Sequence, residues 1–327
     1  MRPEGRGLES AAVPRLNLHS DEQLHVLVPT TAVGDAAEAL SPRVRAHLVD
    51  PDDGAPSGAA ALAQVWVPRN GSPGVPGNGF LDGLPDLQLV QLQSAGAERF
   101  LGRLPKGVVL CNARGAHTPS TAEWVLTAVL AAQRGIPFFT REQDAGRWSP
   151  ATHRTLIGAR VLMIGAGDIG RTVGRMLTGF DVEVTYVART ARDGVHSVAE
   201  LPSLLPTADV VVLLVPVTAE TVGLVDAAFL AAMKDDALLV NAARGVIVDT
   251  DALVAELTSG RLRAVVDVTD PEPLPTGHPL WSAPGLLLTP HVGGNVPQTE
   301  ARAAAAVTAQ LARVLAGEPL ADVVDEY

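Results

Sequence analysis

The chain has 327 residues, of which 47% are hydrophobic, and its formal net charge at pH 7 is −11. This length suits about two domains with a core each, whereas the acidic balance argues against a nucleic-acid or anionic-membrane partner. The single cysteine, Cys111, excludes an internal disulfide and a cysteine-rich metal site.

Residues 1–22 show no hydrophobic periodicity and no apolar block of the kind that a secretory signal carries, so we expect a loose extension here. Apolar runs of strand length follow, separated by segments of helical pattern or by Pro/Gly-rich loops. This alternation predicts a mostly parallel sheet covered by helices. The strands predicted in this half are 25–29, 44–49, 64–68, 87–93 and 107–111.

A longer helical pattern runs from Ser120 to about Arg134, and Gly135 with Pro137 is a stop signal. A polar stretch, 141–155, separates it from a second series of strands. Helical segments follow the first four of these strands, and a final Ala-rich helix is predicted at about 298–316. The second series is predicted at 160–164, 183–187, 209–215, 237–241, 264–267 and 286–289. Because no apolar run approaches the length of a membrane span, we expect a cytoplasmic protein.

A glycine-rich turn follows the first strand of this second series. Its sequence is Gly165-Ala166-Gly167-Asp168-Ile169-Gly170, and it opens a helix that is predicted to end near Leu177. The first glycine permits a tight turn, the second lets the backbone approach a pyrophosphate, and the third lets helix and strand pack closely. Free N–H groups at the helix N-terminus favour an anion. The order of strand, turn and helix therefore predicts a dinucleotide-binding site.

The end of the next strand distinguishes the two nicotinamide dinucleotides. NAD sites usually have an acidic residue about 20 residues beyond the glycines, where it binds the ribose 2′-hydroxyl. Here Arg189 lies 19 residues past Gly170, and Ala188 precedes it. A guanidinium pairs well with a 2′-phosphate, and Arg192 offers a second contact, unless both arginines are solvated loop residues. NADP(H) is therefore favoured over NAD(H).

Polar residues follow three later strands, at the edge where open parallel sheets bind ligands. Arg244, Glu272 and His291 each come shortly after a predicted strand. With the strand order 3-2-1-4-5-6, the strand 237–241 would lie beside the strand that precedes the glycines, so Arg244 would lie close to the glycine turn. Each residue alone could be an ordinary surface or turn residue, but their convergence on one edge predicts a site.

These three side chains suit hydride chemistry on a 2-keto or 2-hydroxy acid. Arginine offers a planar fork for the carboxylate and carbonyl of the substrate. Histidine supplies the proton that the alkoxide needs after hydride addition, and a neighbouring carboxylate orients the imidazole ring. The nicotinamide itself does the redox chemistry.

With these residues the chain resembles the D-isomer-specific 2-hydroxyacid dehydrogenase family. The matching stretches keep the order and spacing of the family over about residues 90–300, which is more specific than any one motif. They are Gly165–Gly170, Val215–Thr221, Asn241–Gly245, Asp267–Pro273, His278–Trp281 and Thr289–Gly294. The chain is most similar to glyoxylate/hydroxypyruvate reductases, or to phosphoglycerate dehydrogenase-like members without a regulatory domain.

The resemblance implies roles for individual residues. Arg244 would bind substrate, Glu272 would pair with His291, and His291 would be the acid/base. Asp267 would hold the nicotinamide carboxamide. The residues expected to contact cofactor are Gly165, Ala166, Gly167, Asp168, Ile169, Gly170, Ala188, Arg189, Thr190, Arg192, Val215, Pro216, Thr221, Ala242, Ala243, Arg244, Asp267, His291 and Gly293. Those expected to contact substrate are Ala95, Gly96, Ala97, Arg244 and His291, and no metal ligand is predicted.

The resemblance also implies the fold and the assembly. The family has two doubly wound parallel-sheet domains with a cleft between them. A Rossmann-type dinucleotide-binding domain, here 119–296, would be inserted in a flavodoxin-like substrate domain made of 23–118 and 297–327. Family members are commonly homodimers joined through their cofactor domains, so we expect a homodimer.

Departures from the family pattern bear on cofactor and substrate. Ala188 replaces the acidic residue of NAD-using members, whereas Arg189 matches glyoxylate/hydroxypyruvate reductases that prefer NADPH. Glu98 and Arg99 differ from the residues that many relatives carry after the loop at 95–97, which leaves the identity of the acid open. The expected function is NAD(P)-dependent interconversion of a small 2-keto acid and its D-2-hydroxy acid.

Two alternatives use the same scaffold. One is a dinucleotide-sensing binding protein or corepressor-like scaffold, because some relatives of this kind retain the Arg–Glu–His set. The other is oxidation of an inorganic anion such as phosphite. We expect structural roles for the other histidines considered, His117, His153 and His278, and packing roles for Trp148 and Trp281.

Overall fold

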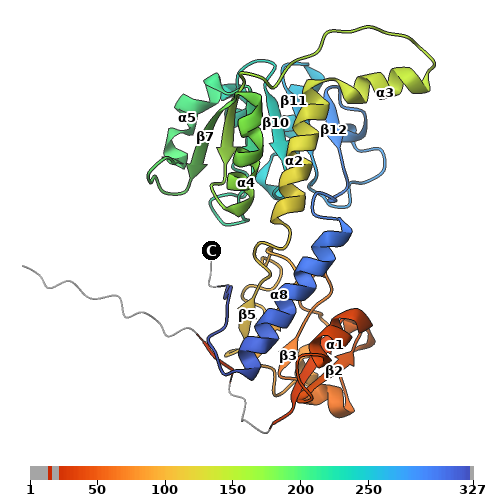
Figure 1. The fold of residues 1–327 in the computed structure, drawn as a ribbon. Coiled ribbons are helices and arrows are strands. Elements are labelled where there is room, and N and C mark those ends of the chain that lie inside the picture. The colour runs from red at the N-terminus through yellow and green to blue at the C-terminus, as the bar shows by residue number, and fades with distance from the viewer. Residues whose placement is uncertain (1–13, 17–21, 325–327) are drawn as a thin grey trace, which may run out of the picture. The chain divides into compact units, whose positions relative to one another are not determined.

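The structure is a computed structural model that describes residues 14–16 and 22–324. It divides into two compact units, one with residues up to Ala116 and from Glu300 onward, the other with His117–Thr299. These boundaries lie two and three residues from the ones expected at 118 and 296. Each unit has its own parallel sheet (Figure 1). Helix α8 (Pro297–Leu315) begins in the second unit and continues into the first.

The sheet of the first unit has the order β2-β1-β3-β4-β5, which is the flavodoxin-like order. Helix α1 (Thr31–Glu38) and helix α8 cover one face, where Val33, Val307 and Leu311 pack on the strands. Short 3-10 turns and loops cover the other face around Trp66, instead of long helices. The strands are β1 (Leu24–Val28), β2 (Val44–Leu48), β3 (Val65–Trp66), β4 (Leu89–Gln91) and β5 (Val109–Cys111).

The N-terminal extension lies mostly outside the described residues. The described part, 14–16, is not loose, because Leu16 is buried in the core of the first unit and Leu320 donates its N–H to the Pro14 carbonyl. Burial raises the pKa of the Cys111 thiol to about 12, so this cysteine is protonated and inert at neutral pH. Within the described ranges, no helix has the length and apolarity that crossing a membrane requires.

The sheet of the second unit has the order β12-β11-β10-β9-β6-β7-β8, all parallel. Strands β9 and β10 are buried along their whole length, as expected for strands covered on both faces. Its strands are β6 (Arg160–Ile164), β7 (Glu183–Ala188), β8 (His196–Ser197), β9 (Val210–Leu213), β10 (Leu238–Asn241), β11 (Arg263–Val266) and β12 (Leu286–Leu288). Its helices before α8 are α2 (Thr118–Gln133), α3 (Ile136–Asp144), α4 (Asp168–Leu177), α5 (Leu201–Leu204), α6 (Ala227–Ala232) and α7 (Thr250–Thr258).

The helices lie on both faces of this sheet. Helices α2 and α4 pack on one face through Val125 and Val173, while α5, α6 and α7 pack on the other. Side chains at the helix starts fix where helices begin: Asp226 accepts the N–H of Phe229 before α6, and Asp249 accepts that of Ala252 before α7.

The prediction that the strand 237–241 lies beside β6 was wrong. Strand β9 pairs with β6, and β10 lies one strand further out. The reason is β8, a strand of only two residues that the sequence analysis missed. Strand β8 is the third strand of this sheet along the chain and lies at its edge, next to β7. The segment 210–213 is therefore the fourth strand instead of the third, and the order 3-2-1-4 places it beside β6. Arg244, which follows β10, is therefore not next to the glycine turn by strand pairing.

Helix α3 was also missed. The stop signal at Gly135 does end α2, but Pro137 lies in the first turn of α3, where proline is well tolerated because its N–H has no helical partner. Helix α3 and the chain after it project from the second unit (Figure 1). His153 packs on Phe139 at 4.9 Å between ring centroids and so anchors the base of this arm, which we define as residues 136–155.

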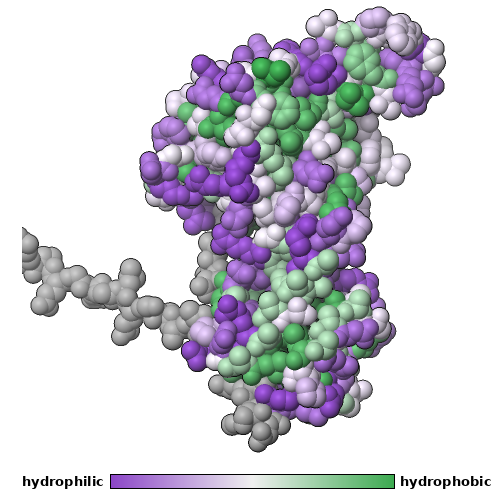
Figure 2. Space-filling model, viewed as in Figure 1, coloured by the Kyte–Doolittle hydropathy of each residue, from purple (hydrophilic) through white to green (hydrophobic). Residues whose placement is uncertain are grey.

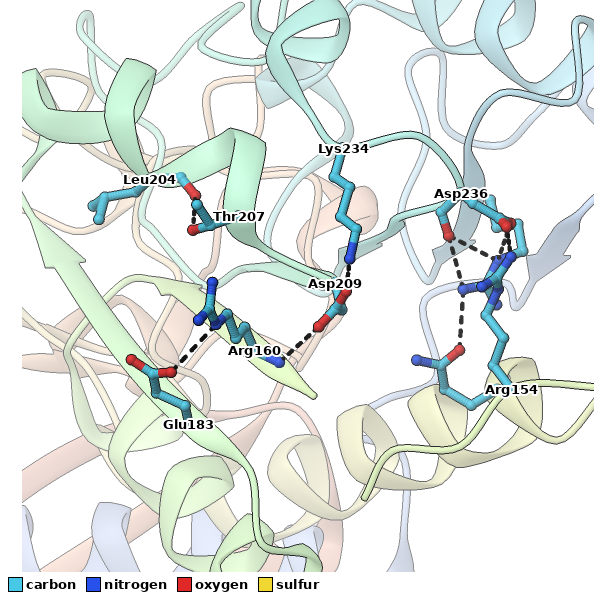
Figure 3. Close-up of polar contacts among 10 residues, drawn as sticks. Arg154, Arg160, Glu183, Leu204, Thr207, Asp209, Lys234 and Asp236 are labelled. Carbon is cyan, nitrogen blue, oxygen red and sulfur yellow. Dashed lines mark hydrogen bonds and ion pairs between the residues drawn. The ribbon is translucent and has the colours of Figure 1, made fainter. Parts of the chain in front are cut away.

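Ion pairs join the amino ends of the strands in this sheet. Lys234 donates to Asp209 at 2.6 Å, and Arg154 pairs with Asp236 (Figure 3). Burial, and to a smaller extent the charge of Arg154, lowers the pKa of Arg263 to about 10. Perturbed pKa values often mark functional sites. These groups, however, lie at the edge opposite the carboxyl ends, so we assign them to the structure of the sheet.

Candidate functional site

The glycine turn lies between β6 and α4, as predicted. Gly165 has φ +121°, a conformation that favours glycine, and a Cβ here would overlap the Leu214 carbonyl oxygen. A Cβ at Gly170 would overlap the Gly165 carbonyl oxygen, so this glycine allows α4 to pack against the turn. Gly167 precedes α4, and apart from its two chain neighbours no residue has an atom within 4 Å of where its Cβ would be. The helix N-terminus therefore has open space beside it.

The strand β7 ends at Ala188, and Arg189 and Arg192 follow it on an exposed loop. Glu220, in the loop after β9, has a lowered pKa, chiefly because Thr218 hydrogen-bonds its carboxylate, with a smaller contribution from the charge of Arg189. The open space at the start of α4 beside Gly167 fits the pyrophosphate of a nicotinamide dinucleotide.

The loop after β9 is fixed by one hydroxyl. The Thr221 hydroxyl donates a hydrogen bond to the Pro216 carbonyl at 2.7 Å, and its Oγ1 accepts one from the N–H of Thr218 at 2.7 Å. Val215 is half-buried at the start of this loop and Pro216 is exposed. Because β9 pairs with β6, this loop, and not the one after β10, adjoins the glycine turn.

The loop after β10 is fixed by Asn241, whose side chain is buried. Its Oδ1 accepts the N–H of Ala243 at 3.0 Å and its Nδ2 donates to the Arg244 carbonyl at 2.9 Å. The Arg244 guanidinium donates to the Ala243 carbonyl at 2.7 Å. Gly245 packs against Thr269, and a Cβ would overlap the backbone there. The loop that carries Arg244 therefore touches the loop that leads to Glu272.

His291 and Glu272 are hydrogen-bonded, as the resemblance implied. The distance from His291 Nδ1 to Glu272 Oε1 is 2.7 Å, and the side chains are 43% and 34% exposed. Both therefore remain accessible to a ligand at the carboxyl edge. The bond engages Nδ1 and orients the imidazole ring, and Nε2 is the ring nitrogen that does not take part in it.

Asp267 holds the turn on which His291 lies. Its buried carboxylate accepts three hydrogen bonds, from the Thr289 hydroxyl at 2.6 Å and from the N–H groups of Val292 at 2.9 Å and Gly293 at 2.7 Å. Its carbonyl accepts the N–H of His291 at 2.6 Å. His291 has φ +53°, an uncommon conformation for a residue with a side chain, so these bonds stabilise a strained turn. This support was not foreseen from the sequence.

The remaining predicted substrate loop belongs to the first unit. Ala95, Gly96 and Ala97 follow β4, and Ala97 is fully buried. Asn112 donates its side-chain N–H to the Ala95 carbonyl at 2.9 Å, which fixes the loop to the chain after β5. Among the residues placed by the structure, no group of three or more His, Cys, Asp or Glu is arranged to hold a metal ion.

Known proteins share this fold and sequence pattern. A family model described as D-isomer specific 2-hydroxyacid dehydrogenase, NAD binding domain, matches residues 126–293. A glyoxylate reductase of Thermofilum pendens is 31% identical over 255 residues, which cover 73% of this chain and 75% of that protein.

Two solved structures show the same architecture. A D-isomer specific 2-hydroxyacid dehydrogenase from Xanthobacter autotrophicus Py2, in complex with NADPH and MES, is 31% identical with a TM-score of 0.79, over 93% of this chain and 98% of that one. An NADPH-dependent glyoxylate/hydroxypyruvate reductase from Sinorhizobium meliloti, in complex with NADP and sulfate, is 26% identical with a TM-score of 0.75, over 93% and 98%.

The chain therefore belongs to the family of D-isomer specific 2-hydroxyacid dehydrogenases, which are oxidoreductases that use NAD(P). The resemblance found from the sequence motifs is confirmed, and so is the α/β fold with a Rossmann-type domain.

Proposed function

We propose that this enzyme reduces a small 2-keto acid, such as glyoxylate or hydroxypyruvate, to the D-2-hydroxy acid, with NADP(H) favoured over NAD(H). The observation that carries the proposal is the 2.7 Å hydrogen bond between His291 and Glu272 at the carboxyl edge of the second sheet. The names of the Thermofilum and Sinorhizobium relatives support the choice of substrate class.

The dinucleotide would be held by the second unit. The N–H groups at the start of α4 would bind its pyrophosphate beside Gly167, and Arg189 and Arg192 would bind a 2′-phosphate. Thr221 would keep the loop after β9 in place beside the glycine turn. When bound, the nicotinamide supplies or accepts the hydride.

The side chains at the carboxyl edge would do the rest of the chemistry. Arg244 would bind the substrate carboxylate through two parallel N–H bonds and so orient the keto carbon. His291 would give its Nε2 proton to the carbonyl oxygen as hydride arrives, and Glu272 would stabilise the imidazolium before that transfer. In the oxidative direction the same nitrogen would take up the hydroxyl proton.

A screen of 2-keto acids with NADPH and with NADH tests this function. We expect oxidation of the cofactor with at least one small 2-keto acid, matched one to one by D-2-hydroxy acid. Tight dinucleotide binding without turnover on any acid would contradict the proposal and favour a sensor or corepressor. Reduction of NADP⁺ by phosphite would contradict it in a second way.

The cofactor preference is tested by Arg189→Ala. Loss of a charge-assisted bond to the 2′-phosphate should lower kcat/KM for NADPH by about ten- to a hundredfold, because such bonds contribute about 1.5–3 kcal/mol. The value for NADH should change little. Arg175→Ala removes an equal charge from the last turn of α4 and should leave both values unchanged. A wild-type enzyme that prefers NADH, with the same preference in Arg189→Ala, would refute the assignment.

We further propose that the protein is a homodimer in which a second copy covers the arm, 136–155. No residue of the arm is buried in the single chain, and its visible face mixes apolar and polar side chains (Figure 2). Trp148, which was expected to pack, is instead 96% exposed. Arg147 and Ser149 both hydrogen-bond Glu142, so the turn that presents this indole is ordered. Exposed tryptophans on ordered segments are frequent interface anchors.

Trp148→Asp should weaken the dimer by about 30-fold or more, because removal of an interface anchor costs roughly 2 kcal/mol or more. Light scattering over a range of concentrations measures this as a shift from twice the chain mass of 34.0 kDa toward that mass. Trp281→Asp is the control, since that side chain is also exposed, at 56%, and lies outside the arm. A monomeric wild-type protein, or equal masses for both variants, would contradict the proposal.

A further inference from the structure

A second imidazole lies behind the turn that carries His291. A Cβ at Gly294 would be 2.6 Å from Cδ2 of His117, which is too close for a carbon contact. Gly294 does not have a positive φ, so a side chain here is opposed by contact with this ring and not by backbone conformation. His117, for which only a structural role was expected, therefore packs directly against the turn.

Two sets of contacts hold the turn. In the first, Asp267 accepts the N–H groups of His291, Val292 and Gly293. The second, which we call the α2 wall, consists of His117, the residue immediately before α2, and Trp124 within α2. A Cβ at Gly293 would be 3.4 Å from the Trp124 indole ring and 2.9 Å from Asp267 Oδ2.

The α2 wall is itself fixed in place. The carbonyl of His117 accepts the N–H of Thr121 at 2.9 Å and the hydroxyl of Ser120 at 3.2 Å. The same Ser120 hydroxyl is hydrogen-bonded to the Thr299 hydroxyl at 2.8 Å, in a buried position. Nδ1 of His117 is buried as well, although the residue as a whole is half-buried. Gly294 and Thr299 are thus both in contact with the start of α2.

We propose that His117 is a positioning residue for the proposed acid His291, and that it acts through its contact with Gly294. The proposal rests on the acid role given to His291 above. Asp267 holds the turn by hydrogen bonds, and the His117 ring packs closely against the same turn at Gly294. Displacement of a reacting group by about 1 Å can cost a hundredfold in rate.

The test is a cycle of Gly294→Ala, His117→Ala and the double variant. In Gly294→Ala the added methyl meets the His117 ring, so we expect kcat to fall about ten- to a hundredfold while KM for the dinucleotide stays unchanged. In the double variant the methyl occupies space that the ring has left, so we expect most of kcat to return. Gly179→Ala is the matched control, because no other residue lies within 4 Å of its Cβ position.

A proton NMR signal makes the test independent of turnover. The proton between His291 Nδ1 and Glu272 should resonate far downfield, and its loss in His291→Gln identifies it. The similar bond of His196 to Glu200, at 2.7 Å on the surface of the same unit, gives a reference signal. We expect the His291 signal to shift or broaden in Gly294→Ala and to return in the double variant, with the reference unchanged.

Two results would overturn the proposal: a His291 signal that is the same in Gly294→Ala and wild type, or a double variant no better than Gly294→Ala. A different result would separate the two proposals. If the wild-type enzyme turned over no 2-keto acid, but the His291 signal changed in Gly294→Ala and returned in the double variant, the proposed function would be rejected. The effect of His117 on the position of the His291 ring would still be supported. Circular dichroism of each variant excludes loss of the fold as the cause.

Discussion

Replacement of His291 by Gln is expected to lower kcat by about three orders of magnitude, while the dissociation constant for NADPH stays within twofold of wild type. The amide keeps hydrogen-bonding capacity but cannot give up a proton at neutral pH, and general acid catalysis typically contributes 10²–10⁴-fold. The dinucleotide is expected to bind mainly at the glycine turn, which the substitution does not touch. Steady-state kinetics with the best 2-keto acid and a fluorescence titration with NADPH measure the two quantities.

The variant Glu272→Gln, which changes the hydrogen-bond partner of His291, is the control with a smaller expected loss of kcat. The amide can still hydrogen-bond the His291 ring, but it no longer stabilises the imidazolium, so kcat should fall less than in His291→Gln. The double variant should be no slower than His291→Gln alone, because the carboxylate acts only through the ring. Equal turnover in wild type and His291→Gln would reject the acid role, and additive losses would show that Glu272 acts separately.

Replacement of Arg244 by Gln is expected to lower kcat/KM for the keto acid strongly. An unpaired substrate carboxylate in the site would cost about 3–5 kcal/mol, which corresponds to a fall in kcat/KM of roughly two to four orders of magnitude. Arg244→Lys should recover only part of this loss, because an ammonium cannot form the two parallel bonds of a guanidinium. Steady-state kinetics with the keto acid, giving kcat/KM for wild type, Arg244→Gln and Arg244→Lys, measures the loss and the partial recovery.

The same series distinguishes substrate binding from loop support. The Arg244 carbonyl, which Asn241 fixes, is unchanged in both variants, so the fold and NADPH binding should persist. Added guanidinium should restore part of the turnover of Arg244→Gln. Unchanged kcat/KM in Arg244→Gln would show that the carboxylate binds elsewhere.

The sequence predicted the elements that depend on local pattern. The glycine turn, the buried strands β6, β9 and β10 and the amphipathic helix α4 all show in residue spacing, because each buries a regular set of side chains. The pairing of His291 with Glu272 came from motif spacing within a known family. Local patterns thus located the glycine turn, whereas the His291–Glu272 pair followed from the family resemblance.

What the sequence could not predict depends on pairings between distant segments. Strand β8 has two residues and no periodicity, yet its place in the sheet decides which loop adjoins Gly165. The three hydrogen bonds on Asp267 come from residues more than 20 positions away, and the contact of His117 with Gly294 spans the whole second unit. The packing role predicted for Trp148 was wrong, because hydrophobicity favours burial but does not exclude an exposed position, and this side chain is 96% exposed.

A crystal structure of the enzyme with NADPH and an unreactive 2-keto acid analogue, such as oxamate, would show whether Arg244 and His291 bind the substrate. We expect the analogue carboxylate on the Arg244 guanidinium and its carbonyl oxygen about 3 Å from Nε2 of His291, with the Glu272 bond intact. An analogue bound beside the nicotinamide but out of reach of both side chains would contradict it.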